Sequence, residues 1–324
     1  MKQKFIISIA ILALLIIIGL IAKDLFVNKI EPVDNPYKYN IDNLKEIDPA
    51  LVCYDEVMKI KPETENIYGI AIDNNDEIFI SGEKKIYVFN NIGELTNAFS
   101  TQENINALNF LPNNNLIVSY QKKLVEINNK GEEINEWNPL NEKSLFTSLA
   151  VNDTSVFAAD AGNKVVLQYN FDGEIIMEIG KKDTTRKIPG FIIPSGYFDL
   201  LIGRYGELWV VNPGFHELYH FNSKGNLVST WGETSMQLDG FSGCCNPSHI
   251  AMLSDGSFVT SEKGIERVKI HDQSGDFQCV VAAPDHFKQG TKGLDLAVDS
   301  KDRIYVLDPV KKVVNVFQKK SELK

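Results

Sequence analysis

The sequence predicts an all-β, six-bladed β-propeller that is closed by an N-terminal strand and preceded by one transmembrane helix. Three observations support this fold: a strand phrase that recurs six times, a glycine turn that follows it, and one uncharged apolar run near the N-terminus. The 324 residues are 44% hydrophobic and 23% charged, which excludes disordered and low-complexity classes. We expect a membrane anchor over 1–24, a linker over 25–50 and the propeller over 51–324.

The apolar run extends from Phe5 to Ala22 and is long enough to cross a bilayer as a helix. Lys2 and Lys4 precede it, and this basic flank favours a cytoplasmic N-terminus with an exported remainder. A cleaved signal peptide is the alternative, but its apolar core is usually shorter, and no small-x-small site precedes Lys23. We therefore expect the membrane as a partner and the bulk of the chain in a periplasmic or extracellular location.

A polar segment with three prolines follows the apolar run, and the chain as a whole is acidic. Residues 25–50 are polar and hold Pro32, Pro36 and Pro49, as is typical of a linker. The formal net charge is -10 and the pI is near 5.1. Nucleic acid is therefore excluded as an expected partner, because its binding depends on a basic face.

The repeat is the main signal for the fold. Its strand phrase appears as EIFIS, NLIVS, SVFAA, ELWVV, SFVTS and RIYVL, marked by Phe79, Ile117, Phe157, Trp209, Phe258 and Tyr305. A second phrase follows each of the first five copies, and its turn contains Gly93, Gly131, Gly173, Gly225 or Gly275. A glycine turn between two alternating apolar strands is typical of a β-hairpin. A period near 40 to 50 residues with several short strands per copy is typical of a propeller blade.

The sixth copy contains only three strands, and a lone strand precedes the first copy at residues 51–61. We expect this lone strand to complete the last blade, because closure of the ring removes an exposed sheet edge. The expected blades are near 54–60 with 292–320, 67–101, 104–141, 144–183, 190–233 and 243–287.

Two phrases resemble NHL repeats: IAIDNNDEIFIS at 70–81 and LAVDSKDRIYVLDPVKKVVNVF at 296–317. The resemblance covers most of residues 67–320. The stretch FSGCCNPSHIAMLSDGSFVTSEKGIERVKIHD is also similar to a bacterial exported NHL subgroup with a GCCNP signature. The family includes scaffolds, ligand binders and a few enzymes, such as the peptidyl-α-hydroxyglycine amidating lyase. A lyase of that type needs several metal-binding histidines, and five histidines in all make this activity doubtful.

Long connections predict where a ligand binds. The first three blades have short connections, whereas those at roughly 183–197, 234–248 and 284–294 are long. Insertions that gather on one face of a propeller commonly mark its binding face, although they can also simply cover the channel mouth. We expect a small ligand or protein partner at the mouth built by blades four to six, and the candidate contacts are Tyr197, His216, Glu262, Lys263 and Arg267.

Each of these candidates has a structural alternative. The charged residues Glu262, Lys263 and Arg267 can pair with one another, or Arg267 can clamp a ligand carboxylate. His216 lies in the loop NPGFHEL, where an exposed position is expected. His271 occupies the position that other blades fill with Phe89 or Phe221, so we expect it to pack between blades.

The innermost strands start near Gly69, Thr147, Asp199, Ser248 or His249, and Asp295. If these side chains share the channel mouth, Asp199, His249 and Asp295 form a candidate site for a divalent metal ion. They can also serve general acid–base catalysis. The structural alternative is that the two aspartates cap backbone N–H groups of the adjacent blade.

The adjacent cysteines Cys244 and Cys245 are followed by Asn246-Pro247, which favours a sharp turn. In an exported domain we expect them to form a vicinal disulfide, which is strained because adjacent Cα atoms lie only about 3.8 Å apart. Three hypotheses remain open: a rigid structural loop, a ligand-contacting platform, and a redox or thiolate metal site with His249. For Cys53 and Cys279 we expect buried free thiols, since they can pair only if the outer strands that carry them approach each other.

The sequence therefore favours a membrane-anchored binding propeller. The alternative is a metal- or thiol-dependent enzyme, a lyase or a redox enzyme, that uses Asp199, His249, Asp295 and the Cys244–Cys245 pair. Convergence of these side chains on one point distinguishes the two hypotheses.

Overall fold

The computed structural model describes residues 2–26 and 42–321, and these divide into two units at Ile41/Asp42. The expected linker over 25–50 falls largely on residues outside the described ranges. The N-terminal unit contains helix α1 (Lys2–Phe26), whose segment Phe5–Lys23 is long and apolar enough to cross a membrane. This supports either a membrane anchor or a signal sequence.

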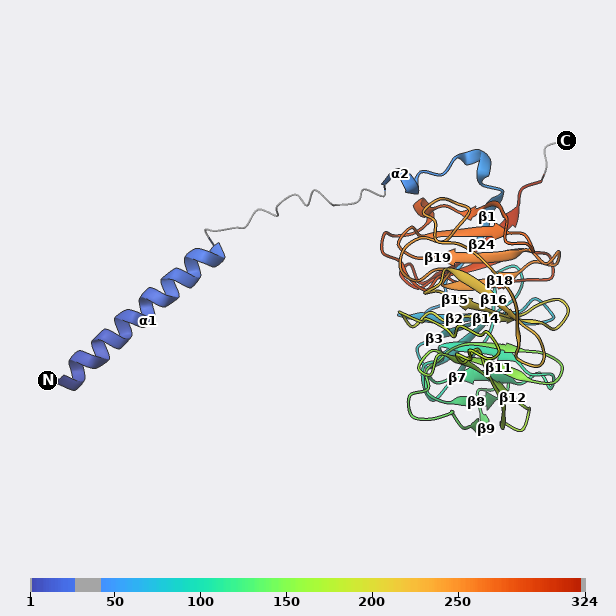
Figure 1. Cartoon of the computed structure of the whole chain (residues 1–324), viewed down its shortest axis with the longest axis horizontal. Coiled ribbons are helices and arrows are strands. Elements are labelled where there is room, and N and C mark those ends of the chain that lie inside the picture. The colour runs from blue at the N-terminus through green and yellow to red at the C-terminus, as the bar shows by residue number, and fades with distance from the viewer. Residues whose placement is uncertain (1, 27–41, 322–324) are drawn as a thin grey trace. The chain divides into compact units, whose positions relative to one another are not determined.

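The described residues of the second unit form six four-stranded sheets, which confirms the predicted six-bladed, all-β propeller (Figure 1). The first three blades contain β2 (Ile67–Ile72), β3 (Ile78–Gly82), β4 (Lys85–Phe89) and β5 (Leu95–Ser100); β6 (Ala107–Phe110), β7 (Leu116–Ser119), β8 (Leu124–Ile127) and β9 (Glu133–Trp137); and β10 (Phe146–Val151), β11 (Val156–Asp160), β12 (Val165–Tyr169) and β13 (Ile175–Ile179).

The fourth and fifth blades contain β14 (Leu200–Ile202), β15 (Leu208–Asn212), β16 (Glu217–Phe221) and β17 (Leu227–Trp231); and β18 (His249–Met252), β19 (Phe258–Glu262), β20 (Arg267–His271) and β21 (Phe277–Ala282). The sixth contains β22 (Asp295–Val298), β23 (Ile304–Asp308), β24 (Val313–Lys319) and β1 (Tyr54–Ile60). Short helical segments lie outside the blades: α2 (Asp42–Lys45), η1 (Pro49–Leu51) and η2 (Pro284–His286).

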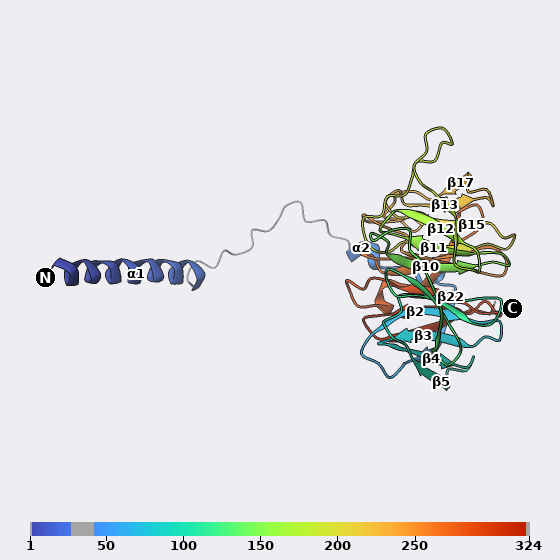
Figure 2. The same cartoon turned by 90° about the horizontal axis from the view of Figure 1, so that it is seen from below.

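The N-terminal strand closes the ring as expected. Strand β1 pairs antiparallel with β24, and Ile60 lies opposite Val314 (Figure 1). This closing blade lies beside the first blade, where β22 is next to β2 (Figure 2). The last blade thus combines the first strand of the propeller with its last three strands, and β1 is its fourth strand.

A disulfide between Cys53 and Cys279 joins the segment before β1 to the outer strand of blade five. The prediction of two free thiols is therefore wrong. Val52 forms a parallel bridge with Val280, and Cys53 N–H donates to the Val280 carbonyl at 3.1 Å. This pairing of the segment with a strand of the neighbouring blade brings the sulfurs together, and the sequence period does not reveal it.

The blades pack face to face because their second and third strands are buried on both sides. All five residues of β15 are buried, whereas most of the outer strand β9 is exposed. A serine at the end of three strand phrases also ties one blade to the next. The hydroxyls of Ser81, Ser119 and Ser261 donate to carbonyls of Ile105, Phe146 and Leu294 in the following blade.

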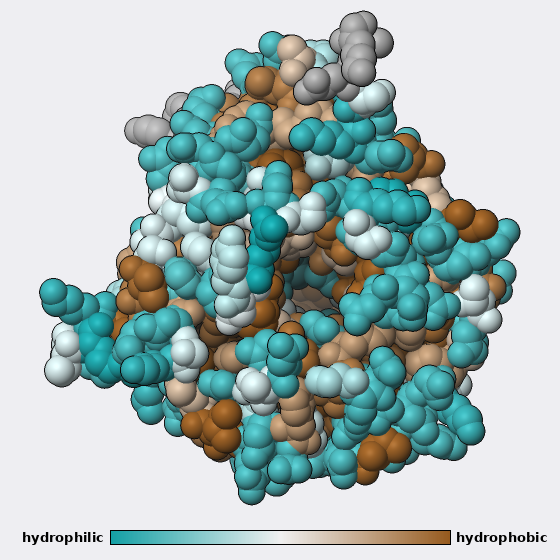
Figure 3. Space-filling model, turned by 90° about the vertical axis from the view of Figure 1, so that its right-hand side faces the viewer, coloured by the Kyte–Doolittle hydropathy of each residue, from teal (hydrophilic) through white to brown (hydrophobic). Residues whose placement is uncertain are grey.

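The antiparallel order defines two faces. The long-loop face carries the blade-to-blade connections 180–199, 232–248 and 283–294 and the loops between second and third strands. The short-turn face carries the turns between first and second strands, and β24 ends on this side. Figure 3 views the short-turn face and shows a hollow at the centre. The central channel, lined by the innermost strands, has a volume of about 290 Å³.

Candidate functional site

A buried ion cluster fixes the connection between blades four and five on the long-loop face. Glu262 ends β19, and its Oε1 lies 2.8 Å from both Arg267 Nε and Lys269 Nζ. Its Oε2 accepts hydrogen bonds from the N–H and hydroxyl of Ser242. Arg267 Nη2 donates to the Gln237 carbonyl, and Lys269 Nζ donates to the carbonyls of Leu238 and Gly240. The cluster therefore holds residues 237–242 against the blade.

Of the two alternatives for Glu262 and Arg267, this arrangement is the internal pairing. Both side chains are 1% exposed or less, so neither can contact a ligand at the surface of this structure. Burial raises the pKa of Glu262, but the charges of Lys269 and Arg267 outweigh burial and hold it below its usual value. Burial lowers the pKa of Lys269 to about 8. Lys263, the third residue of the predicted charged group, does not join this cluster and instead contacts Cys245 and Ser195.

The cysteine pair lies directly after this fixed segment. Cys244 is exposed and Cys245 is 3% exposed; the structure holds both as thiols, with their sulfurs 2.9 Å apart. The expected vicinal disulfide is therefore not formed in this structure. Asn246 clamps the loop, since its Nδ2 donates to the carbonyls of Ser242 and Lys263 and its Oδ1 accepts from Lys263 N–H. The peptide bond Asn246–Pro247 is cis.

Lys263 joins the cysteine pair to the connection between blades three and four. Its Nζ lies 2.8 Å from Cys245 Sγ and 2.7 Å from Ser195 Oγ. The same ammonium lies 4.9 Å from the centroid of the Tyr197 ring, within the range of a cation–π interaction. Three segments that are distant in sequence thus meet at one charged group.

The two thiols differ in acidity because their surroundings differ. Burial raises the pKa of Cys245, but hydrogen bonds from Cys244, Lys263 and Ser195 and the lysine charge outweigh burial, so its pKa is lowered. The hydrogen bond to Cys245, followed by burial, raises the pKa of Cys244. The buried Cys245 is therefore the more acidic thiol of the pair, and the exposed Cys244 is the less acidic one.

At the channel end, Asp199 and Asp295 follow the structural alternative, in which they cap backbone N–H groups. Asp199 Oδ2 accepts from Ile250 N–H at 2.7 Å, and Asp295 Oδ2 accepts from Ile70 N–H at 3.1 Å. Each carboxylate also accepts the N–H of the residue that follows it. Both aspartates therefore cap the adjacent blade. Among the described residues, no group of three or more His, Cys, Asp or Glu side chains fits a metal ion.

His249 nevertheless lies close to the thiol site. Its ring stands edge-on to Tyr197 with centroids 5.7 Å apart, so Tyr197 contacts both His249 and Lys263. Its buried Nδ1 has no hydrogen-bond partner among the described residues. Burial raises the pKa of Asp295 to about 6, while the nearby His249 opposes this rise and Asp199 adds to it.

The other histidines have structural surroundings. His216 is only 8% exposed and has a positive φ of 61°, so the expectation of an exposed loop residue is wrong. Burial lowers its pKa. His271 is fully buried and packs against Trp231 and Phe241, which confirms its predicted packing role.

Sequence reasoning missed Ser195 and Lys269. Lys269 carried a usable signal, because it is a charged residue inside the strand RVKIH, which is buried throughout. Ser195 carried none, since nothing distinguishes one serine in a long connection from another. Its role depends on the position of Lys263, 68 residues later.

Comparisons with known proteins identify the fold. The virginiamycin B lyase from Staphylococcus aureus is similar with a TM-score of 0.55 and 10% sequence identity over 82% of this chain and 99% of that chain. A catalytically inactive variant of that enzyme with quinupristin gives a TM-score of 0.55 and 11% identity over 82% of this chain and 99% of that chain. A streptogramin B lyase gives a TM-score of 0.56 and 9% identity over 84% of this chain and all of that chain.

At these identities the likeness establishes the six-bladed propeller and not the activity. No protein-family model matches the sequence, and no curated protein matches it. The NHL resemblance and its GCCNP subgroup therefore remain predictions from the repeat phrases. What the chain is shown to be is a six-bladed β-propeller with one N-terminal helix that could cross a membrane.

Proposed function

We propose that this protein is a membrane-anchored, extracytoplasmic binding propeller whose ligand docks on the long-loop face of blades four to six, against Cys244. The observation that carries the proposal is the contact of Lys263 Nζ with Cys245 Sγ beside the exposed Cys244 thiol. A partly buried ammonium that faces a thiol has a chemical consequence, because it favours the thiolate.

The ligand class follows from these thiols. Cys244 is the accessible sulfur, and Cys245 accepts its proton. When a ligand carries a disulfide, Cys244 attacks one sulfur and forms a mixed disulfide, and the other ligand sulfur leaves as a thiolate. Because closure of a vicinal disulfide is strained, resolution by Cys245 is slow and the ligand remains covalently held.

The location is supported by two features of the chain. Lys2 and Lys4 precede the apolar helix, which favours export of the remainder. The Cys53–Cys279 disulfide is typical of an oxidising compartment.

A thiol-dependent redox enzyme is the second candidate. It is favoured by the lowered pKa of Cys245 and by the position of His249, which packs on the Tyr197 ring that Lys263 also contacts. In that case Cys245 attacks the mixed disulfide, the vicinal disulfide forms, and the ligand leaves as a thiol.

One experiment tests both location and thiol role. Spheroplasts that express the full chain are treated with a membrane-impermeant maleimide, and the purified chain is incubated with glutathione disulfide and weighed intact. We expect rapid labelling that Cys244→Ser abolishes and a stable glutathione adduct on Cys244. Formation of the adduct releases one glutathione for each disulfide consumed. Release of the second glutathione, with a vicinal disulfide in place of the adduct, supports the redox enzyme, and failure of both labelling and adduct formation overturns the proposal.

A further inference from the structure

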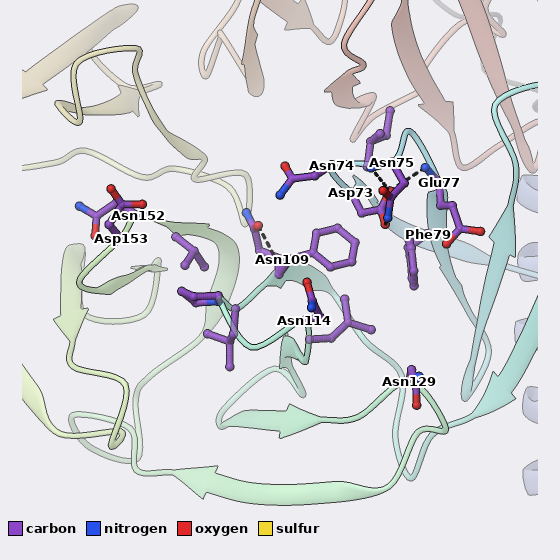
Figure 4. A pocket seen from close by; sticks show the side chains of 16 residues that line it. Asp73, Asn74, Asn75, Glu77, Phe79, Asn109, Asn114, Asn129, Asn152 and Asp153 are labelled. Atoms are coloured by element: carbon purple, nitrogen blue, oxygen red, sulfur yellow. Dashed lines mark hydrogen bonds between the residues drawn. The ribbon is translucent and has the colours of Figure 1, made fainter.

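A second cleft lies on the short-turn face, away from the thiol site. It has a volume of about 580 Å³ and is lined mainly by the first-to-second strand turns of blades one, two and three, together with Asn129 from the turn between β8 and β9. Figure 4 shows its labelled side chains: Asn152 and Asp153 at one end, Asp73 and Glu77 at the other, and Asn109 between them. Nothing in the proposed function of the long-loop face uses this cleft.

On the same face, pairs of hydrogen bonds join the turns of some neighbouring blades, and the turns of blades one and two lack this clasp. Ser300 donates from its N–H and hydroxyl to Asp76, and Ser254 donates in the same way to Asp302. These clasps join blade six to blade one and blade five to blade six. The corresponding position in blade two is Asn114, whose side chain makes no hydrogen bond among the described residues.

The polar lining consists mainly of carboxamides. Five asparagines other than Asn109 line the cleft: Asn74, Asn75, Asn114, Asn129 and Asn152. The side chains of Asn74, Asn114 and Asn129 are exposed and, within the part of the chain that the structure describes, form no hydrogen bond. A carboxamide both donates and accepts, so each can pair with a hydroxyl group in either direction.

Two phenylalanines supply the apolar part of the cleft. Phe79 and Phe110 both line it, and their rings stand edge to face with centroids 4.9 Å apart. Both are half-buried, so each ring is packed on the blades and still presents part of its surface. Aromatic rings with adjacent hydrogen-bonding side chains suit ligands that have both C–H faces and hydroxyl groups.

The charge of the lining restricts the ligand further. Asp73, Glu77 and Asp153 line the cleft, and no Lys, Arg or His does so among the described residues. Asp73 already accepts hydrogen bonds from the N–H groups of Asn75 and Glu77 and shapes its own turn. The lining therefore repels phosphate, sulfate and carboxylate groups and accepts an uncharged ligand or one with an amino group.

We propose that the cleft between the turns of blades one, two and three binds a saccharide without anionic groups. The carboxamides pair with its hydroxyls and the ring surfaces of Phe79 and Phe110 contact its C–H faces. The site is separate from the thiol site, so the protein has two independent binding faces.

Binding is measured by saturation-transfer NMR and calorimetry with the full chain in detergent. The probes are chitotriose and maltotriose as uncharged saccharides, a chitosan trimer as the amino-bearing one, and trigalacturonic acid as the anionic one. We expect at least one of the first three to bind and trigalacturonic acid not to bind. Asn74→Ala with Asn114→Ala weakens binding at least about tenfold, since two hydrogen bonds are lost.

Asn97→Ala is the matched control, because Asn97 is an exposed amide on the outer strand β5 and does not line the cleft. It leaves the affinity unchanged. Phe79→Leu keeps the core filled and also weakens binding. The proposal is overturned if none of the non-anionic saccharides binds, if trigalacturonic acid binds equally well, or if the double variant binds like Asn97→Ala. The proposal is also overturned if an unstructured asparagine-rich peptide binds the cleft and none of the saccharides does.

Discussion

Cys53 is bonded to Cys279, 226 residues away, immediately before the strand that closes the ring. Cys53 directly precedes β1 in the sequence, so the bond attaches the start of the closing strand to blade five, while the strand itself completes blade six. The ring is therefore closed by the hydrogen bonds between β1 and β24 and also by the covalent bond between Cys53 and Cys279.

Reduction or replacement of this disulfide is expected to lower the free energy of unfolding by about 2–5 kcal/mol, because the bond restricts a very long loop in the unfolded chain. Urea unfolding of Cys53→Ser, followed by tryptophan fluorescence under non-reducing conditions, measures the loss. Cys244→Ser is the control and leaves the midpoint unchanged. An equal midpoint for Cys53→Ser and the unaltered chain would refute a stabilising role for the bond.

Lys263→Met is expected to raise the pKa of Cys245, because it removes both a hydrogen bond and a charge that lower it. The pH at which the pair becomes reactive should therefore move upward. Alkylation rates with iodoacetamide between pH 5 and 10, resolved by peptide mass spectrometry, measure the shift. Lys224→Met, which changes a lysine in an exposed turn, serves as the control, and an unchanged pH profile for Lys263→Met contradicts the assignment.

Glu262→Gln is expected to lower the free energy of unfolding by about 3–5 kcal/mol, since it leaves Arg267 and Lys269 buried without a carboxylate. The pKa of Glu262 is held below its usual 4.5, so its contribution is present above that pH and is lost as the pH falls through the lower folded value. Urea midpoints at pH 7 and pH 4 test both statements. The exposed Glu233→Gln should change neither midpoint.

His271→Phe is expected to reduce acid sensitivity. Burial, aided by the charge of Lys269, lowers the pKa of His271 from 6.5 to about 4. The unfolded chain therefore binds a proton between these values while the folded chain does not, and stability falls as the pH drops from 6.5 to 4. The loss is about 3 kcal/mol. Differential unfolding at pH 7 and pH 4.5 should show a smaller difference in His271→Phe than in the unaltered chain or in His286→Gln.

Much of the fold was predictable because the evidence for it is periodic. The strand phrase marks the second strand of each blade, and its terminal serine in EIFIS, NLIVS and SFVTS forms the same bond to the next blade. The site was only partly predictable. The long connections and the Cys244–Cys245 pair marked the candidate site in the sequence. The roles of Ser195 and of the buried Glu262–Arg267–Lys269 cluster depend on segments that meet only in the folded chain.

The sequence by itself determined the blades, their closure by residues 54–60 and the apolar N-terminal helix, because local alternation and a fixed period specify strands and their order. Only the tertiary structure decided the partners of individual groups. It turned Asp199 and Asp295 toward backbone N–H groups, paired Cys53 with Cys279 and directed Lys263 to Cys245. Such choices depend on distances of a few ångströms between blades, and a period of 40 to 50 residues does not encode those distances.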